Sequence, residues 1–157
     1  LTSDYPTLFY VETKTMTLQE MFDKAVAHFA DMDRPSMTAP NEYGGTDCAY
    51  RGHEGNKCIV GAFIDDEHYD VAIESKGVLE YESFNKSCGV QPVLNAVAAS
   101  MGVEALDFKQ QQLLYKLQLI HDDHSDGFDI NEDNWYSLVE APLIDLAYKS
   151  GLEHNVG

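Results

Sequence analysis

The sequence lacks the features that would place this chain in a membrane or hold it together with disulfides. No apolar run approaches the roughly 20 residues that a membrane-spanning helix needs. The first residues show neither the basic region nor the apolar core of a signal peptide. The 3 cysteines are an odd number without a disulfide-framework spacing, which favours reduced thiols. We therefore expect a cytoplasmic protein that has no contact with a membrane.

Basic residues are also scarce. Only 10 Lys and Arg stand against 27 Asp and Glu, which gives a formal net charge of −17. A field of this sign repels nucleic acid and attracts basic partners or cations, so we expect no direct nucleic-acid binding. The imbalance is strongest between Lys116 and Lys149, where the charged residues are Asp122, Asp123, Asp126, Asp129, Glu132, Asp133, Glu140 and Asp145. A solvated acidic surface explains this segment more simply than a mimic of DNA.

The length and the pattern of the chain predict one domain with an N-terminal extension. A chain of 157 residues can bury roughly two thirds of its unfolded surface and needs no disulfide. Residues 1–15 are rich in β-branched side chains and show no helical period, whereas a helical pattern begins at Met16. We expect an extension at residues 1–15 and a single domain at residues 16–157, with Met16 as the natural start.

Apolar periodicity predicts about four helices. The run Thr17-Leu-Gln-Glu20 fits a capping box and opens a helix that should reach Met32. A second helix should cover residues 93–101, and a third should begin near Asp107. The fourth should run from about residue 131 to residue 151, with Pro142 either kinking it or starting a new turn.

A β-hairpin is predicted in the middle of the chain. Residues 48–51 and 57–64 flank Gly52-His-Glu-Gly-Asn56, in which the Gly-Asn pair supplies the positive φ of a hairpin turn. With the helices, this makes the expected fold class α+β, with about four helices and one small antiparallel β-hairpin. The preceding segment, residues 34–47, is a loop of unusual length for a compact domain, and such loops often carry function.

Several separated sequence motifs occur along the domain in a fixed order. They are Met16-Thr-Leu-Gln-Glu20, Cys48-Ala-Tyr-Arg51, Lys57-Cys58-Ile-Val-Gly61, Asp66-Glu67-His68-Tyr69, Leu117-Gln118 with His121-Asp122, and Trp135 with a closing Gly151-Leu152. In these motifs the chain resembles a family of uncharacterised small proteins from tailed phages, prophages and bacterial genomes. The resemblance covers most of residues 16–152 and implies a phage-type gene product, but it implies no activity.

One possible chemistry is nucleophilic catalysis by a cysteine. Cys58 with His121 or His68 could form a thiolate–imidazole pair, and Asp122 could orient the imidazole ring. No nucleophile signature surrounds Cys58, however, and most strand cysteines are small buried hydrophobic residues. A structural role for Cys58 is therefore the preferred interpretation.

Metal binding is a second possibility, with two candidate ligand sets. Zinc could be held by Cys48, Cys58, His121 and His124, although the spacing of the two cysteines is wider than in a zinc knuckle. Calcium could be held by Asp122, Asp126 and Asp133, with Gly127 at the sixth position of an EF-hand-like loop. That loop has His at position 3 and Asp in place of the bidentate Glu at position 12. We expect neither site, and no cofactor.

The remaining cluster could bind an anion or a partner. It consists of Arg51, Lys57, Asp66, Glu67 and Tyr69. Two cations near one turn could hold a carboxylate or another anion, but an internal salt-bridge network needs no ligand and is the simpler interpretation.

The sequence thus favours a binding or regulatory protein, encoded by a phage and acting on a host protein with a basic surface in the host cytosol. The alternative is a cysteine- and histidine-dependent enzyme or a metal-binding module. The two differ in whether the thiol and the imidazole lie within hydrogen-bond reach of each other.

Overall fold

The protein is described by a computed structural model in which residues 15–74 and 91–155 are placed. The extension predicted at residues 1–15 lies outside these ranges except for its last residue. The described helices, in chain order, are α1 (Leu18–Asp31), α2 (Ile59–Ala62), η1 (Asp66–His68), η2 (Val71–Ile73), α3 (Gln91–Ser100), α4 (Phe108–Ser125) and α5 (Trp135–Ser150). None of them is both long and apolar enough to cross a membrane.

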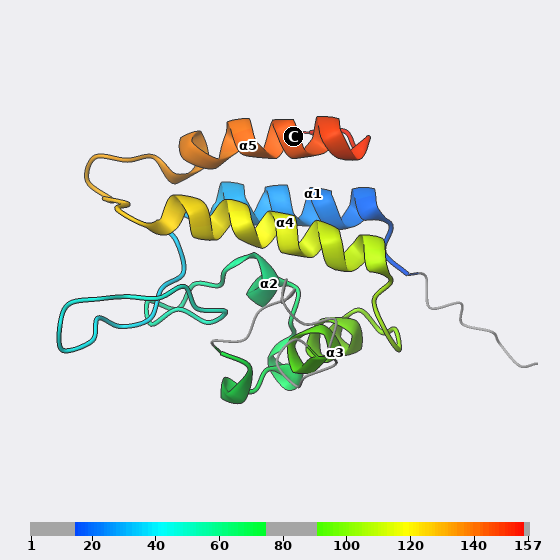
Figure 1. The fold of residues 1–157 in the computed structure, drawn as a ribbon, viewed down its shortest axis with the longest axis horizontal. Helices are drawn as coiled ribbons and strands as arrows, with labels where there is room; N and C mark the ends of the chain where they lie inside the picture. Colours follow the sequence, from blue (N-terminus) through cyan, green and yellow to red (C-terminus); the bar gives the residue numbers. More distant parts are fainter. Residues whose placement is uncertain (1–14, 75–90, 156–157) are drawn as a thin grey trace, which may run out of the picture.

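Three long helices form the body of the molecule (Figure 1). Helices α1 and α4 lie side by side and run in the same direction, and α5 packs antiparallel across both of them. On the other side of α1 and α4 lie α2 and then α3, which contacts η1. The core between these layers contains fully buried aromatic and aliphatic side chains, among them Phe22, Phe29, Leu114, Trp135 and Leu143.

The predicted helices α1, α3, α4 and α5 are confirmed, and local sequence explains their ends. The Thr17 hydroxyl accepts a hydrogen bond from the Glu20 amide at 3.1 Å and caps α1, but the described contacts do not include the reciprocal Glu20 side-chain bond of the predicted capping box. Asp107 and Gln110 form a reciprocal capping box at the start of α4. Gly151 ends α5 with a φ of 66°, a left-handed conformation that favours glycine. Helix α5 is continuous through Pro142 and does not begin again there.

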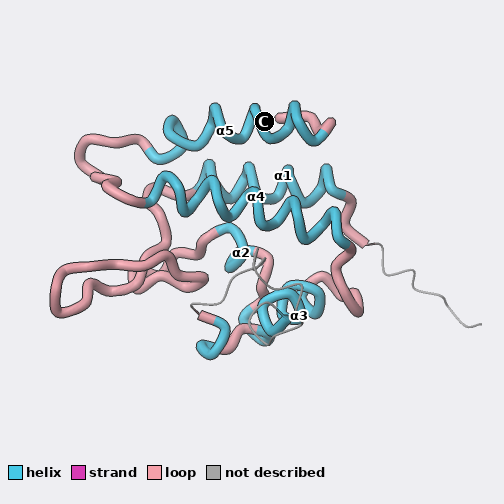
Figure 2. The backbone as a smooth tube through the Cα atoms, in the orientation of Figure 1, coloured by secondary structure: helices cyan, strands magenta, loops and turns pink. Residues whose placement is uncertain are grey.

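The predicted β-hairpin is wrong, and so is the α+β fold class, because the described residues form helices and no strand (Figure 2). The turn at residues 52–56 does form, with the Gly52 amide bonded to the Asn56 carbonyl at 2.8 Å. It joins only one antiparallel residue pair, Arg51 with Lys57, and a second isolated pair links Met37 to Cys48. The pairing stops there because the chain turns into α2 directly after Cys58.

Two contacts from distant parts of the chain make residues 59–62 helical. The Val60 amide, one of the unpaired donors at the start of α2, bonds to the side-chain oxygen of Gln118 on α4 at 3.0 Å. Gly61 lies so close to the Tyr50 carbonyl that a Cβ atom would come within 2.0 Å of its oxygen. A short apolar run is ambiguous between strand and helix, and here these tertiary contacts select the helix.

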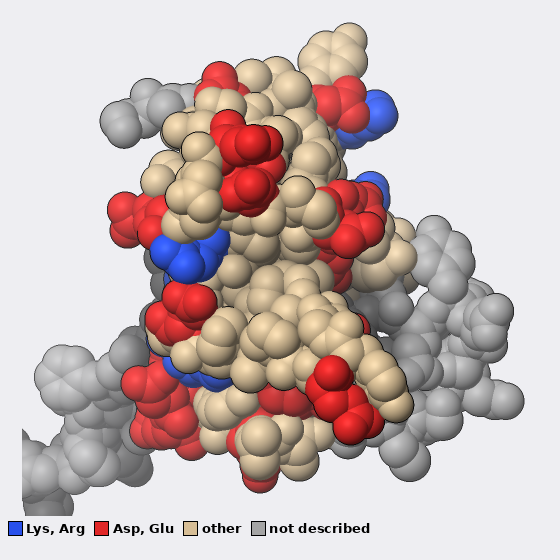
Figure 3. Space-filling view, turned by 90° about the vertical axis from the view of Figure 1, so that its left-hand side faces the viewer, with Lys and Arg blue, Asp and Glu red and all other residues tan. Residues whose placement is uncertain are grey.

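The two ends of the helical body differ in what surrounds them (Figure 1). At one end, the C-terminus of α4 meets the start of α5, and the long loop after α1 folds against them. At the other end lie the first turns of α1 and α4 and the last turn of α5. Figure 3 views the first of these ends, where acidic side chains outnumber basic ones. The candidate site lies at this acidic end.

Candidate functional site

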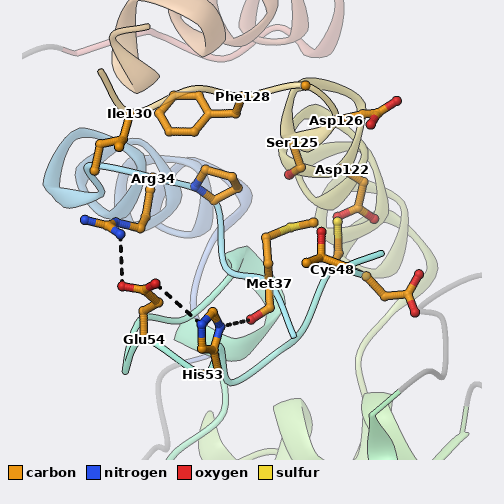
Figure 4. A pocket seen from close by; sticks show the side chains of 14 residues that line it. Arg34, Met37, Cys48, His53, Glu54, Asp122, Ser125, Asp126, Phe128 and Ile130 are labelled. Atoms are coloured by element: carbon orange, nitrogen blue, oxygen red, sulfur yellow. Dashed lines mark hydrogen bonds and ion pairs between the residues drawn. The ribbon is translucent and has the colours of Figure 1, made fainter. Parts of the chain in front are cut away.

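A cavity of about 460 Å³ opens between the loop that follows α1 and the C-terminal end of α4. The loop contributes residues from Arg34 to Glu54, and α4 with its following turn contributes residues from Asp122 to Ile130. Four of the lining residues are apolar, Pro35, Met37, Phe128 and Ile130, and Figure 4 shows Phe128 and Ile130 next to each other on one side. The other lining side chains are mostly polar or acidic: Thr46, Asp47, Cys48, Asp122, Ser125 and Asp126.

A chain of interactions holds one edge of the cavity in place. The Arg34 guanidinium donates to the Glu54 carboxylate at 2.9 Å. The other carboxylate oxygen of Glu54 lies 3.4 Å from Nε2 of His53, and the His53 Nδ1 atom lies 3.3 Å from the Met37 carbonyl. Figure 4 shows these contacts side by side. The basic residue on this edge is therefore already paired with Glu54.

His121 is fully buried and contacts Asp122, one of the residues that line the cavity. Its Nε2 atom receives a hydrogen bond from the Ser36 amide at 3.0 Å. An amide can only donate, so Nε2 is the acceptor and the ring proton of the neutral form sits on Nδ1. Nδ1–H then donates to the Asp122 carboxylate at 2.9 Å. The ring packs edge-on against Trp135, with centroids 5.5 Å apart, so both nitrogens and one face are occupied.

Asp122 connects this buried imidazole to the cavity. The oxygen that accepts from His121 also accepts from the Gln118 amide at 2.7 Å. Burial opposes ionisation of Asp122, but the hydrogen bonds from His121 and Gln118 outweigh it and hold the pKa of the Asp122 carboxyl below its usual range. Asp122 is therefore a fixed negative charge in the cavity lining.

Cys48 is the thiol that lies beside His121 and Asp122. It is half-buried in the cavity lining, where its sulfur lies within 4.8 Å of ligand atoms of His121 and Asp122. Burial, followed by the negative charge of Asp122, raises the pKa of the Cys48 thiol to about 12. A thiol with this pKa stays protonated near neutral pH and is a poor nucleophile.

Cys48, His121 and Asp122 also offer an S, N, O ligand set, with ligand atoms within 4.8 Å of one another. The hydrogen bonds do not suit a metal ion at His121. A metal on Nδ1 would move the ring proton to Nε2, where it would face the Ser36 N–H across 3.0 Å. Two donors would then oppose each other in a buried site, which costs about 1–3 kcal/mol for an unsatisfied group. The three side chains fit a hydrogen-bonded cluster better than a metal centre.

Cys58, the cysteine singled out from the sequence, has a different position. Its sulfur accepts a hydrogen bond from the Gly61 amide at 3.4 Å and caps α2. Cys58 is fully buried, and burial raises the pKa of its thiol. His68 lies beside Glu67 at 3.4 Å, at η1. The structure therefore places a cysteine next to His121 and Asp122, but that cysteine is Cys48.

The metal sets considered from the sequence do not assemble among the described residues. His124 bonds through Nδ1 to the Ile120 carbonyl of its own helix at 2.7 Å, so it is turned away from a zinc site. Asp122 lies in the last turn of α4, and Asp133 accepts from the Asp129 amide at 2.9 Å in the following loop. The helix extends through Ser125, so Asp122, Asp126 and Asp133 are not the ligands of one calcium loop.

Arg51 is part of an internal network. Its guanidinium donates to Asp66 and to the Ile64 carbonyl, each at 2.7 Å, and lies 4.8 Å from the ring centroid of Tyr69. Lys57 reaches the same Asp66 carboxylate at 3.7 Å. Of the five residues in the sequence cluster, four thus contact one another, whereas the Glu67 carboxylate reaches His68 instead.

Glu74 closes this network from a position that the sequence did not single out. Its carboxylate accepts from the Tyr50 and Arg51 amides at 3.0 Å and from the Tyr69 hydroxyl at 2.7 Å. Burial, followed by the hydrogen bond to Glu74, raises the pKa of Tyr69 to about 12. These side chains bind one another, which leaves little capacity for an external anion.

The sequence also missed the groups that organise the cavity. Ser36 carries no local signal, because it contacts a residue 85 positions away. Gln118 stood in a sequence motif, but its contact with a residue 58 positions away could not be predicted from that motif. Phe128 lies in the acidic segment that was predicted to be a solvated surface, yet its ring packs against Trp135 with centroids 5.6 Å apart. The one sequence feature that could have predicted this packing is the position of an aromatic residue between two predicted helices.

Comparison of the chain with protein-family models, with curated proteins and with solved structures gives no significant match.

Proposed function

We propose that this protein is a binding protein and that the cavity receives a basic side chain of a partner protein. The observation that carries the proposal is the state of two carboxylates in the cavity lining. Asp47 and Asp126 are exposed there, and neither forms an ion pair with any described basic residue. Together with the ionised Asp122, they present negative charge that a lysine or arginine from outside can neutralise.

The apolar lining residues suit the rest of such a side chain. Lys and Arg carry a long methylene stem, which gains stability against apolar surface while the charged group stays near polar atoms. Pro35, Met37 and Ile130 offer that surface, and the ring of Phe128 offers a face for a cation–π contact. An arginine would gain more than a lysine, because its planar guanidinium can contact carboxylates in pairs and stack on a ring.

Catalysis by the cluster of Cys48, His121 and Asp122 is a weaker explanation. The Cys48 thiol has a pKa of about 12, and the two nitrogens of His121 contact Asp122 and the Ser36 amide instead of the sulfur. A thiol enzyme needs the imidazole to accept the thiol proton. The cluster instead supports the lining of a binding site, because it fixes the Asp122 carboxylate in one orientation.

The wider setting of the proposal comes from the sequence. The resemblance to small proteins of tailed phages and prophages, together with the strong negative charge, favours a phage product that regulates a host protein through a basic segment. The host cytosol is the compartment in which such a partner would be met. The phage origin and the host partner extend the binding proposal, and each can be tested independently of it.

The binding proposal can be tested with small probes of defined charge. We would titrate the isotope-labelled protein with N-acetyl-arginine amide, N-acetyl-lysine amide and the neutral N-acetyl-citrulline amide, and follow backbone amide signals by NMR. We expect saturable shifts at Asp47, Asp126 and Phe128 with the arginine probe, weaker shifts with the lysine probe, and none with the citrulline probe. The citrulline probe keeps the shape of arginine and removes only its charge.

Two variants separate the site from the overall negative charge. Asp126→Asn should weaken arginine binding by about tenfold, equivalent to about 1.4 kcal/mol. Glu104→Gln removes one exposed carboxylate that lies outside the cavity lining, and it should leave the affinity unchanged. Equal binding of arginine and citrulline, or equal loss in both variants, would show that the cavity does not recognise a cation.

A further inference from the structure

The end of the molecule opposite the cavity carries a groove with the opposite charge. Its walls come from the first residue of α1, from the first half of α4 and from the end of α5. These segments meet at the end of the helical body that lies away from the long loop (Figure 1). Three lysines line the groove, Lys109 and Lys116 on α4 and Lys149 on α5, and no Asp or Glu is among the lining residues.

Such a grouping is unexpected in this composition. The chain has 10 Lys and Arg against 27 Asp and Glu, so a basic residue would ordinarily lie beside a carboxylate. Most of the other described basic residues follow this expectation: Arg34 pairs with Glu54, and Arg51 and Lys57 pair with Asp66. Lys24 has no ion pair among the described residues, but it lies over the ring of Phe63. In the groove, Lys149 pairs with Asp145 at 2.8 Å.

Lys109 and Lys116 differ from these residues. Both are exposed, and within residues 15–74 and 91–155 neither forms an ion pair. They are separated by seven positions, or roughly 10 Å along the axis of α4 at 1.5 Å per residue. Because side chains two turns apart share one face of a helix, both ammonium groups can approach one ligand in the groove.

The position of Lys109 adds a second indication. It lies in the first turn of α4, where the positive end of the helix dipole disfavours a cation and favours an anion. A lysine at this place therefore gains nothing from its own helix. The Asp107 carboxylate already caps this end of α4, so the attraction for a bound anion would come from the two unpaired lysines.

We propose that this groove binds a small phosphate-bearing ligand. Lysine is a common phosphate ligand because its compact ammonium acts as a point charge. Two lysines attract a doubly charged phosphate more strongly than they attract a singly charged carboxylate ligand. The polar side chains of Gln112 and Ser150 also line the groove and can bond phosphate oxygens. Its volume, about 230 Å³, suits a small ligand, and the net charge of −17 opposes a long polyanion. This site does not depend on the proposed function of the cavity.

The test uses inorganic phosphate and pyrophosphate as probes for the full chain. At constant ionic strength, we expect saturable NMR shifts of the Lys109, Gln112 and Lys116 amides, with tighter binding of pyrophosphate. Chloride and acetate at the same ionic strength should give no saturable shift. A single-stranded oligothymidylate should not compete, because a polyanion is repelled by the rest of the surface.

Matched substitutions locate the site. Lys109→Gln and Lys116→Gln should each weaken pyrophosphate binding by about tenfold, which corresponds to about 1.4 kcal/mol. Lys24→Gln removes the same charge outside the groove and should leave the affinity within a factor of about two. The proposal is overturned if all three variants lose affinity equally, if acetate shifts the same amides as strongly, or if the oligothymidylate binds more tightly than pyrophosphate.

Discussion

The ion-pair network around Arg51 and the cavity beside α4 make opposite use of their polar side chains. Around Arg51, Asp66, Tyr69 and Glu74, the polar groups are largely bonded to one another, although the buried Arg51 Nε atom has no hydrogen-bond partner among the described residues. Around the cavity, Asp47 and Asp126 have no such partner among the described residues. The first region is a structural network, and the second is a surface that can still form interactions.

This contrast shows why the most distinctive part of the sequence is not the best functional candidate. Within residues 48–69, Cys58 caps α2, and Arg51, Lys57 and Asp66 form an ion-pair network. Cys48 is the exception, because it lines the cavity. The capacity to bind lies with groups that the fold leaves unpaired. The predictions below test whether substitutions in the two regions differ in this way.

The largest effect is expected for Gly61→Ala. Its Cβ would lie 2.0 Å from the Tyr50 carbonyl oxygen, and backbone cannot move aside as a flexible side chain can. We expect a loss of about 3 kcal/mol or more, at or above the usual range for overpacking. Urea denaturation of the wild type and of Gly61→Ala measures this loss of unfolding free energy.

Gly127→Ala is the matched control at the cavity. Gly127 has a φ of 72° and open space around the position of a Cβ atom, so the same substitution should cost only about 1 kcal/mol of backbone strain. Similar losses of unfolding free energy in the two variants would mean that the close approach of Gly61 to the Tyr50 carbonyl is not important for stability.

The second effect concerns the support of the cavity lining. His121→Ala would leave the buried Ser36 amide without its acceptor and create a void beside Trp135. We expect a loss of about 3 kcal/mol from the unsatisfied donor and the void together. His124→Ala removes a half-buried ring that bonds only to its own helix, and it should cost less than about 1 kcal/mol. If His124→Ala proved the more damaging, the cluster would not be the support described.

A third test uses the pH dependence of Asp122. The pKa of its carboxyl is lowered in the folded protein, so the folded state binds this proton less readily than the unfolded state. The ionised carboxylate therefore contributes stability above the unfolded Asp pKa of about 3.9, and that contribution is lost as the pH falls through the lower folded value.

Thermal melting of the wild type and of Asp122→Asn should thus differ most near neutral pH and converge below about pH 4. Asp123→Asn, an exposed neighbour, should track the wild type at every pH. A constant difference between the wild type and Asp122→Asn from pH 7 to pH 3 would contradict a stabilising role for the ionised Asp122 carboxylate.

The smallest expected effect is on thiol reactivity. With a pKa of about 12, native Cys48 should react slowly with maleimide near neutral pH, and its rate should keep rising up to pH 10 without a plateau. Asp122→Asn removes a negative charge that raises the pKa of Cys48, so this variant should react faster. Both proteins would carry Cys88→Ser, because Cys88 lies outside the described residues. A plateau below pH 8 would indicate an activated thiolate and would favour the enzyme interpretation.

The fold could be predicted where the information is local. The helices at Thr17 and Asp107 and the stop at Gly151 depend on caps and on apolar spacing within a few residues, and these predictions are confirmed. The hairpin failed at residues 57–64, where the deciding contacts come from Gln118 and from the Tyr50 backbone. An apolar run of four residues does not reveal such partners.

The candidate site could be predicted only in part. His121 and Asp122 could be identified because two neighbouring polar residues at the end of a predicted helix are visible in the sequence. In the structure they contact each other. The thiol beside them was misassigned, since Cys58 turns inward as the cap of α2 while Cys48 faces the cavity. The direction of each sulfur follows from how the loop after α1 packs on α4.

By itself, the sequence determined the helical segments, their ends and the strong negative charge, because these depend on the residues themselves and on neighbours within a turn or two. Only the tertiary structure decided which polar groups are used up inside the fold and which remain available. Hydrogen bonds such as that between Ser36 and His121 span 85 positions, and they form only after packing has brought the loop onto α4. The cavity is thus a consequence of how the loop after α1 packs on α4, with Asp47 and Asp126 left unpaired at its surface.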